Sequence, residues 1–211
     1  MDAVRIGVIG VGAMGSSHVK YLQAGDVKRC TLTAVCDTDP ARIEKIEGVK
    51  KYADSKELIR SGDVDAVLVA TPHYDHTTIG IDALENGLHL LVEKPISVHK
   101  ADCERLIAAH EKAKGQVFGA MFMHRTLNLK KKIKQMIDAG ELGTIQRVNW
   151  LATTWFRSEQ YYASGGWRAT WRGEGGGVLL NQSPHDLDMM QWYLVCRPLL
   201  QTNSYLGKYH D

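Results

Sequence analysis

The feature that most constrains this chain is a glycine-rich turn that joins an apolar segment to a helical pattern. The run RIGVIGVGAMG places Gly10, Gly12 and Gly15 in the spacing G-x-G-x-x-G. The first glycine permits a tight turn, the second lets a pyrophosphate approach the backbone, and the third lets the helix pack close to the strand. Ala13 and Met14 then begin the helix and turn backbone N–H groups toward an anion. The turn therefore predicts a dinucleotide site.

A carboxylate at the end of the next apolar segment supports this interpretation, because glycine patterns alone also mark plain turns. The segment 32–36 runs directly into Asp37. This is about 20 residues past the glycine turn, where an acidic side chain accepts hydrogen bonds from an adenosine ribose. Such a carboxylate repels a 2′-phosphate and so favours NAD, although Thr38 and Arg42 leave room for NADP.

Apolar runs and helical patterns alternate through the first half of the chain. Strands are expected at 4–9, 32–36, 66–70, 89–92 and 116–120, and helices at 14–24, 41–46, 55–60, 77–86 and 100–114. This alternation is typical of an α/β fold, a doubly wound parallel sheet covered on both faces. Ligands of such sheets bind at the carboxyl ends of the strands.

Two loops at those carboxyl ends carry polar residues that we expect beside the cofactor. They contain Thr71, Pro72 and His76 after one strand, and Glu93, Lys94 and Pro95 after the next. The Lys94–Pro95 bond is a candidate for the cis form, which X–Pro bonds adopt in some tight functional turns.

The pattern changes near residues 121–125, where we place a domain boundary. The expected division is a dinucleotide-binding domain over 1–123 and a second, partial α/β domain over 124–211. The second domain is expected to hold a helix at 127–139, a long strand at 145–156, a polar and aromatic loop at 157–177, and a further strand near 201–206.

A polar constellation follows a triple glycine in this second half. If residues 178–192 form one helix, Asn181, His185 and Asp188 share a face. Alternatively, Ser183 is an N-cap and Pro184 starts a new helix, which leaves Asn181 just outside it.

Composition excludes several classes of partner and site. The formal net charge of the 211 residues is +2, which gives no indication of a nucleic-acid surface, and no apolar run is long enough to span a bilayer. The four cysteines lack metal-type spacing, so we expect reduced thiols and no metal site. The first strand leaves no room for a signal peptide, so we expect a cytoplasmic protein.

These motifs together resemble the Gfo/Idh/MocA oxidoreductases, the glucose–fructose oxidoreductase and inositol dehydrogenase family. The resemblance rests on the glycine turn, Asp37, Ala70-Thr71-Pro72, Glu93-Lys94-Pro95, Trp167-Arg168, Gly175-Gly176-Gly177 and Asn181, His185 and Asp188. It implies a Rossmann domain followed by an α/β domain with a large antiparallel sheet that forms a homo-oligomer interface. The chain stops at Asp211, where family members continue with most of that sheet, so we expect a truncated or incomplete form.

The resemblance also implies roles for individual residues. Hydride passes between NAD(P) and a secondary alcohol of a sugar or inositol, Lys94 contacts the hydroxyl and the nicotinamide ribose, and His185 is the base. Asn181 stands where the inositol dehydrogenase pattern has an aspartate, so it can hydrogen-bond the substrate or the base but supplies no charge. Asp188 is a candidate substrate contact, with capping or packing as the alternative. Trp167 and Arg168 are expected to close over the cofactor or substrate.

Two other functions remain open at this stage. One is an NAD-dependent glycoside hydrolase, which would cleave glycosides with no net NADH. The other is a non-catalytic nucleotide-binding regulator of the same fold, against which Lys94 and His185 argue.

Overall fold

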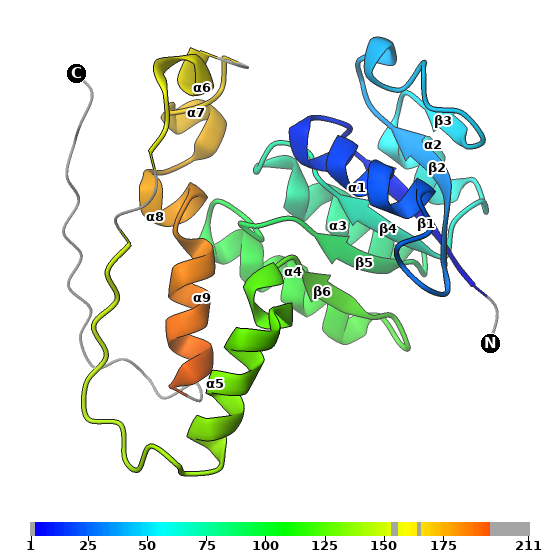
Figure 1. Ribbon diagram of the computed structural model, residues 1–211. Helices are drawn as coiled ribbons and strands as arrows, with labels where there is room; N and C mark the ends of the chain where they lie inside the picture. Colours follow the sequence, from blue (N-terminus) through cyan, green and yellow to red (C-terminus); the bar gives the residue numbers. More distant parts are fainter. Residues whose placement is uncertain (1–2, 153–155, 164–165, 195–211) are drawn as a thin grey trace. The chain divides into compact units, whose positions relative to one another are not determined.

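The computed structural model describes residues 3–152, 156–163 and 166–194, and these form two compact units (Figure 1). The first unit comprises Met1–Met121 and Trp155–Pro184, and the second comprises Phe122–Thr154 and His185–Asp211. The expected strand near 201–206 lies outside the described residues. The domain boundary near residues 121–125 stays a prediction.

The first unit is built on a six-stranded parallel sheet in the order β3-β2-β1-β4-β5-β6. Its strands are β1 (Val4–Ile9), β2 (Cys30–Cys36), β3 (Lys50–Tyr52), β4 (Ala66–Val69), β5 (His89–Val92) and β6 (Phe118–Ala120). The central strands β1 and β4 are almost wholly apolar because helices cover both faces of the sheet. This confirms the α/β fold predicted from the alternating pattern.

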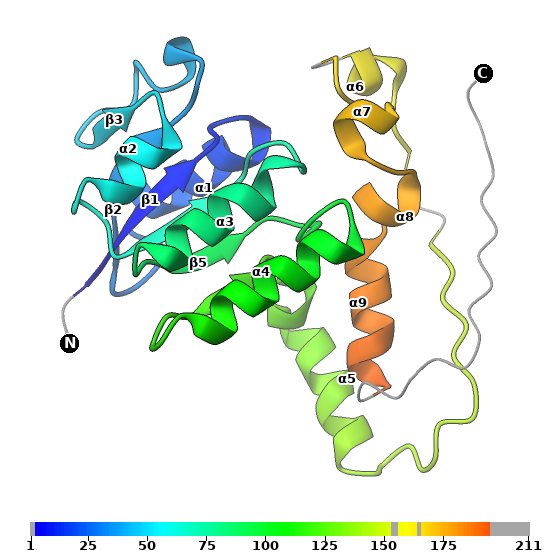
Figure 2. The same cartoon turned by 180° about the vertical axis from the view of Figure 1, so that it is seen from behind.

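Alternate residues of β1, β2, β4 and β5 enter two separate apolar clusters, one on each face. On one face, Val8, Val35 and Leu68 pack with α1 (Ala13–Gln23). On the other face, the remaining core residues pack with α2 (Ser55–Arg60), α3 (Asp75–Glu85) and α4 (Lys100–Lys112). Figure 1 looks onto the face covered by α1, and Figure 2 onto the opposite face.

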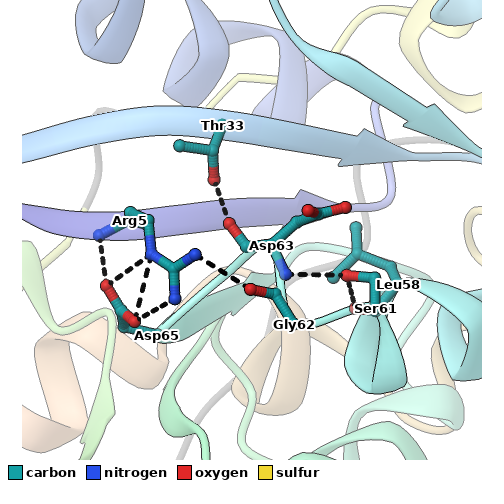
Figure 3. Close-up of polar contacts among 7 residues, drawn as sticks. All are labelled: Arg5, Thr33, Leu58, Ser61, Gly62, Asp63 and Asp65. Carbon is teal, nitrogen blue, oxygen red and sulfur yellow. Dashed lines mark hydrogen bonds and ion pairs between the residues drawn. The ribbon is translucent and has the colours of Figure 1, made fainter.

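Polar contacts join the loop before β4 to the amino-terminal ends of β1 and β2 (Figure 3). The backbone N–H and the guanidinium of Arg5 donate to Asp65, and Arg5 also donates to the carbonyl of Gly62 at 2.8 Å. The hydroxyl of Thr33 donates to the carbonyl of Asp63 at 2.9 Å. The Arg5 and Asp65 side chains are more than 40% exposed, so water screens this ion pair and it adds little to the stability of the fold.

Two predictions for the first unit were wrong in detail. The helix expected at 41–46 is only the 3₁₀ turn η1 (Pro40–Arg42), because the backbone N–H groups of Arg42 and Ile43 donate to carbonyls three residues back, to Asp39 and Pro40. The segment 157–177 is not all loop, since α6 (Glu159–Ala163) and α7 (Trp171–Glu174) form within it.

The described part of the second unit is helical. It contains η2 (Met123–Thr126), α5 (Asn128–Asp138) and α9 (Pro184–Tyr193). The strand expected at 145–156 does not form over 145–152, and no strand lies beside it within the described residues of this unit. A strand needs a neighbour to satisfy its backbone hydrogen bonds, and none is present there. The antiparallel sheet is likewise absent from the described ranges.

Pro184 begins α9, which agrees with the second of the two arrangements considered from the sequence. The preceding turn of helix, α8 (Val178–Asn181), ends at Asn181. No helix in the described ranges is both long enough and apolar enough to span a bilayer.

Candidate cofactor and substrate site

The three glycines of the turn play different parts. Gly10 has φ +88°, and a Cβ there would lie 2.7 Å from the backbone nitrogen of Thr71. A Cβ on Gly15 would overlap the carbonyl oxygen of Gly10, at 1.8 Å. At Gly12 the nearest described atom that a Cβ would meet is Nη1 of Arg42, at 3.8 Å. Gly10 and Gly15 therefore allow the turn to pack, whereas Gly12 leaves the adjacent space open.

The start of α1 faces this open space with backbone donors. Gly12 is the N-cap, and no side chain caps the first turn, which begins at Ala13 and Met14. Uncapped N–H groups and the positive end of the helix dipole attract an anion. The residues present therefore fit the pyrophosphate of a dinucleotide.

Asp37 braces the glycine turn from the end of β2. Its carboxylate is buried, and Oδ2 accepts from the N–H of Val11 at 2.7 Å while Oδ1 accepts from the N–H of Asp39 at 2.9 Å. Arg42 lies 3.6 Å from Oδ2. Each carboxylate oxygen can accept more than one hydrogen bond, so the predicted contact with a ribose hydroxyl remains open to Asp37.

The loop after β4 contains a buried polar atom without a partner. Thr71 Oγ1 has no hydrogen-bond partner among the described residues, although Thr71 adjoins the turn at Gly10. A buried hydroxyl is normally paired, so this atom suits a ligand that supplies the missing bond.

His76 joins the loops that follow β4 and β5. Its ring is 1% exposed, and its two nitrogens lie 2.8 Å from the carbonyl of Pro95 and 2.9 Å from the carbonyl of Thr71. Burial lowers the pKa of His76. Both nitrogens thus face backbone carbonyls. The structure therefore places His76, which was predicted to lie beside the cofactor, where it links the backbone at Thr71 to the backbone at Pro95.

Glu93 links the end of β5 to α1. Its Oε1 lies 2.7 Å from Nε2 of His18, whose Nδ1 lies 2.7 Å from the hydroxyl of Tyr21. Burial alone would raise the pKa of Glu93, but the hydrogen bond with His18 and the nearby Lys94 outweigh it, so the pKa lies below its usual value. Glu93 therefore remains an acceptor that holds α1 against this loop.

Lys94 follows directly and precedes a cis peptide bond to Pro95. Its Nζ donates to the backbone carbonyl of Asn181 at 2.6 Å. Burial lowers the pKa of Lys94, Arg157 and Arg168 lower it further, and Glu93 and Glu174 oppose them. The first unit therefore brings Lys94 and Asn181 together from distant parts of the sequence.

The predicted pair Trp167 and Arg168 packs within the first unit. Trp167 contacts the ring of His73 edge-on, with centroids 5.3 Å apart. The guanidinium of Arg168 lies over the ring of Tyr161 and donates to its hydroxyl at 2.7 Å. The structure thus places Trp167 against the loop after β4.

Sequence reasoning passed over two residues of this unit, His73 and Glu174. Nδ1 of His73 donates to the carbonyl of Glu174 at 2.9 Å. The Glu174 carboxylate accepts from the side-chain amide of Asn181. A single acidic residue in a run of glycines, GEGGG, was the available indication of Glu174.

The remaining predicted residues, His185 and Asp188, lie on α9 in the second unit. His185 stacks on His124, with ring centroids 4.6 Å apart and planes at 28°. Asp188 accepts two hydrogen bonds from Arg125, at 2.8 and 2.5 Å. Sequence reasoning did not single out His124 or Arg125. That Lys94 and His185 act on the same substrate hydroxyl stays a prediction.

The parallel sheet, the glycine turn and the uncapped helix define a Rossmann protein of the dinucleotide-binding class. Residues 4–121 match a family described as an oxidoreductase family with an NAD-binding Rossmann fold, GFO_IDH_MocA. Residues 131–199 match the GFO/IDH/MocA C-terminal domain. The chain therefore belongs to the Gfo/Idh/MocA family of oxidoreductases.

Named relatives and solved structures agree with this assignment. Inositol 2-dehydrogenase 1 of Saccharopolyspora erythraea is 38% identical over 146 residues, which is 66% of this chain and 43% of the relative. The WlbA dehydrogenase of Bordetella pertussis, solved with NADH and UDP-GlcNAcA, superposes with a TM-score of 0.79 at 28% identity, over 91% of this chain and 58% of that one. The scyllo-inositol dehydrogenase of Lactobacillus casei, solved with NAD(H) and scyllo-inositol, gives 0.77 at 25% identity, over 91% and 56%. The chain spans about half the length of the relatives that it matches.

Proposed function

We propose that this chain forms the cofactor site and part of the substrate site of an NAD-dependent dehydrogenase that acts on a secondary alcohol of a sugar or inositol-like polyol. The observation that carries the proposal is the open space beside Gly12, between the closely packed Gly10 and Gly15 and next to the uncapped start of α1. The inositol dehydrogenases among the relatives support the substrate class.

When bound, the nicotinamide supplies the hydride acceptor. Lys94 stabilises the negative charge that develops on the substrate oxygen, because its ammonium is largely removed from water. Lysine has three donors, and the Asn181 carbonyl takes one of them, so two remain for a substrate hydroxyl and a ribose hydroxyl. Glu93 and His18 hold Lys94 and α1 in fixed relation.

We propose His185 as the base that takes the hydroxyl proton, since histidine titrates near neutral pH. Its stacking on His124 restrains the orientation of the ring. Asn181 offers its side-chain oxygen to the substrate, because its amide nitrogen is bound to Glu174. In this proposal Asp188 acts by holding the guanidinium of Arg125, which donates to its carboxylate.

A hollow of about 290 Å³ in the first unit suits a polyol. Its wall combines aromatic and polar side chains, and these are Tyr162, Thr170, Trp171, Glu174, Asn181 and Gln182. Mixed walls of this kind orient a ligand with many hydroxyl groups.

Cofactor choice, location and assembly complete the proposal. Asp37 favours NAD over NADP. The residues that line the cofactor in this proposal include Ala13, Met14, Thr71 and Pro72. We further propose a cytoplasmic homo-oligomer with domains over 1–123 and 124–211. Exposed apolar side chains of the second unit, such as Leu129 and Leu151, support an interface there.

Calorimetry with NAD⁺ and NADP⁺, followed by a screen for NADH formation over sugars, sugar acids and inositols, tests the function. We expect tighter binding of NAD⁺. Lys94→Ala should lower turnover by about 10²–10³-fold and His185→Ala by about 10²–10⁴-fold, both with NAD⁺ binding largely intact. Lys100→Ala, at a lysine that is 90% exposed, is the matched control. A folded sample that binds neither nucleotide would refute the proposal.

A further inference from the structure

Glu174 is a buried carboxylate that the proposed reaction does not use. It is the last residue of α7 and is 5% exposed. Burial of a carboxylate is costly unless hydrogen bonds and a nearby cation compensate for the lost water. Its side-chain hydrogen-bond partner is the amide of Asn181, which is neutral. The compensating charge must therefore come from elsewhere.

Two hydrogen bonds lead from this carboxylate to Lys94. Glu174 accepts from the side-chain amide of Asn181, which is itself 6% exposed. The backbone carbonyl of Asn181 accepts from Nζ of Lys94 at 2.6 Å. The Glu174 carboxylate thus holds Asn181, whose backbone carbonyl accepts the hydrogen bond from the Lys94 amine.

The glycine run delivers Glu174 to this position. Gly175 ends α7 in the left-handed conformation, with φ +78°, and a Cβ on it would lie 2.1 Å from a methyl group of Val98. The carbonyl of Glu174 is held by His73. The end of α7 is therefore packed closely against the segment that follows Pro95.

Charged residues of both signs act on Lys94. Arg157 and Arg168 disfavour its protonated form, and so does burial, whereas Glu93 and Glu174 favour it. Glu93 already has His18 and the Lys94 backbone N–H as partners. Glu93 and Glu174 thus both balance the amine, and of the two only Glu174 also binds the Asn181 side chain, whose backbone carbonyl accepts from Nζ.

We propose that Glu174 is a positioning residue for Lys94: it orients Asn181 so that the backbone carbonyl of Asn181 accepts a hydrogen bond from Nζ, and it places a negative charge in the same buried cluster. This rests on the proposed function only in assigning Lys94 to the reacting hydroxyl. The arrangement itself belongs to the protein without substrate.

The test is the titration of Lys94 in protein labelled with ¹³C-lysine, followed through its Cε shift and assigned with Lys94→Arg. Glu174→Gln keeps the shape of the side chain and removes the charge, so the pKa of Lys94 should fall. Glu174→Asp should restore most of the original pKa. Glu111→Gln, at an exposed position of α4, makes the same charge change and should leave Lys94 unaffected. An unchanged Lys94 pKa in Glu174→Gln would overturn the proposal.

A double variant covers the case in which Glu174→Gln does not fold. Lys94→Met with Glu174→Gln removes both charges, so it should recover the folding that the single variant lost. Failure to recover would also overturn the proposal. In active protein, Glu174→Gln should shift the alkaline limb of kcat to lower pH without changing the KM for NAD⁺. A normal Lys94 titration in a protein that forms no NADH would refute the proposed function alone.

Discussion

A pair of glycine substitutions separates the packing of the turn from its predicted use. Gly15→Ala would place a Cβ 1.8 Å from the Gly10 oxygen and 2.9 Å from the Gly10 carbonyl carbon. Both are backbone atoms of a turn held between the ends of β2 and β4, so α1 must move. Overpacking of this kind costs about 1–3 kcal/mol, and we expect the upper end. For a chain of this size, that lowers Tm by about 6–12 °C.

Gly12→Ala should behave in the opposite way. Its backbone, with φ −77°, suits alanine, and the nearest described atom is 3.8 Å away. The free energy of unfolding should stay unchanged or rise by about 0.4–1 kcal/mol, because alanine reduces the conformational entropy of the unfolded chain. The added methyl group would nevertheless occupy the space proposed for the pyrophosphate. We expect NAD⁺ affinity to fall at least tenfold, about 1.4 kcal/mol.

Thermal unfolding by circular dichroism and NAD⁺ titration by calorimetry measure the two effects. Gly25→Ala is the control for backbone strain, because Gly25 has φ +73° and no described atom within 4 Å of its Cβ position. It should cost about 1–2 kcal/mol and leave binding intact. The reasoning would be refuted if Gly12→Ala bound NAD⁺ like the wild type, or if Gly15→Ala unfolded at the wild-type temperature.

Two further predictions concern buried titratable groups. Burial lowers the pKa of His73 from 6.5 to about 4, so between these values the unfolded chain binds a proton that the folded chain does not. The free energy of unfolding should therefore fall as pH drops from 6.5 to 4, by up to about 3 kcal/mol. Urea titrations at several pH values should show that the free energy of unfolding of His73→Gln falls less steeply with pH than that of the wild type. Equal pH dependence in the two proteins would contradict this prediction. Burial likewise raises the pKa of the Cys36 thiol to about 12, so peptide-resolved mass spectrometry should show slower alkylation by iodoacetamide at Cys36 than at the half-buried Cys30 and Cys103. Faster labelling of Cys36 would show that β2 is less buried than the structure indicates.

Sequence reasoning succeeded where one local pattern decides the conformation. The turn at Gly10 and the apolar strands β1 and β4 could be predicted, because glycine conformation and hydrophobic periodicity are properties of a few adjacent residues. It missed β3, whose Lys50 and Lys51 are exposed and so form no apolar run. It also misjudged 145–152, where alternation alone predicted a strand but no neighbouring strand lies within the described part of that unit.

Asp37 was predicted from its distance along the chain from the glycine turn, and Lys94 and Asn181 from the resemblance to the family, but their hydrogen-bond partners were not predicted. The sequence by itself determined a Rossmann domain with a dinucleotide turn, since the glycine turn and the apolar central strands are specified by their neighbours in the chain. Only the tertiary structure decided that Glu93 pairs with His18, that the Asn181 carbonyl accepts a hydrogen bond from Lys94, and that the Glu174 carboxylate accepts one from the Asn181 amide. These contacts join residues that are remote in sequence, and burial strengthens them because water no longer competes for the same donors and charges.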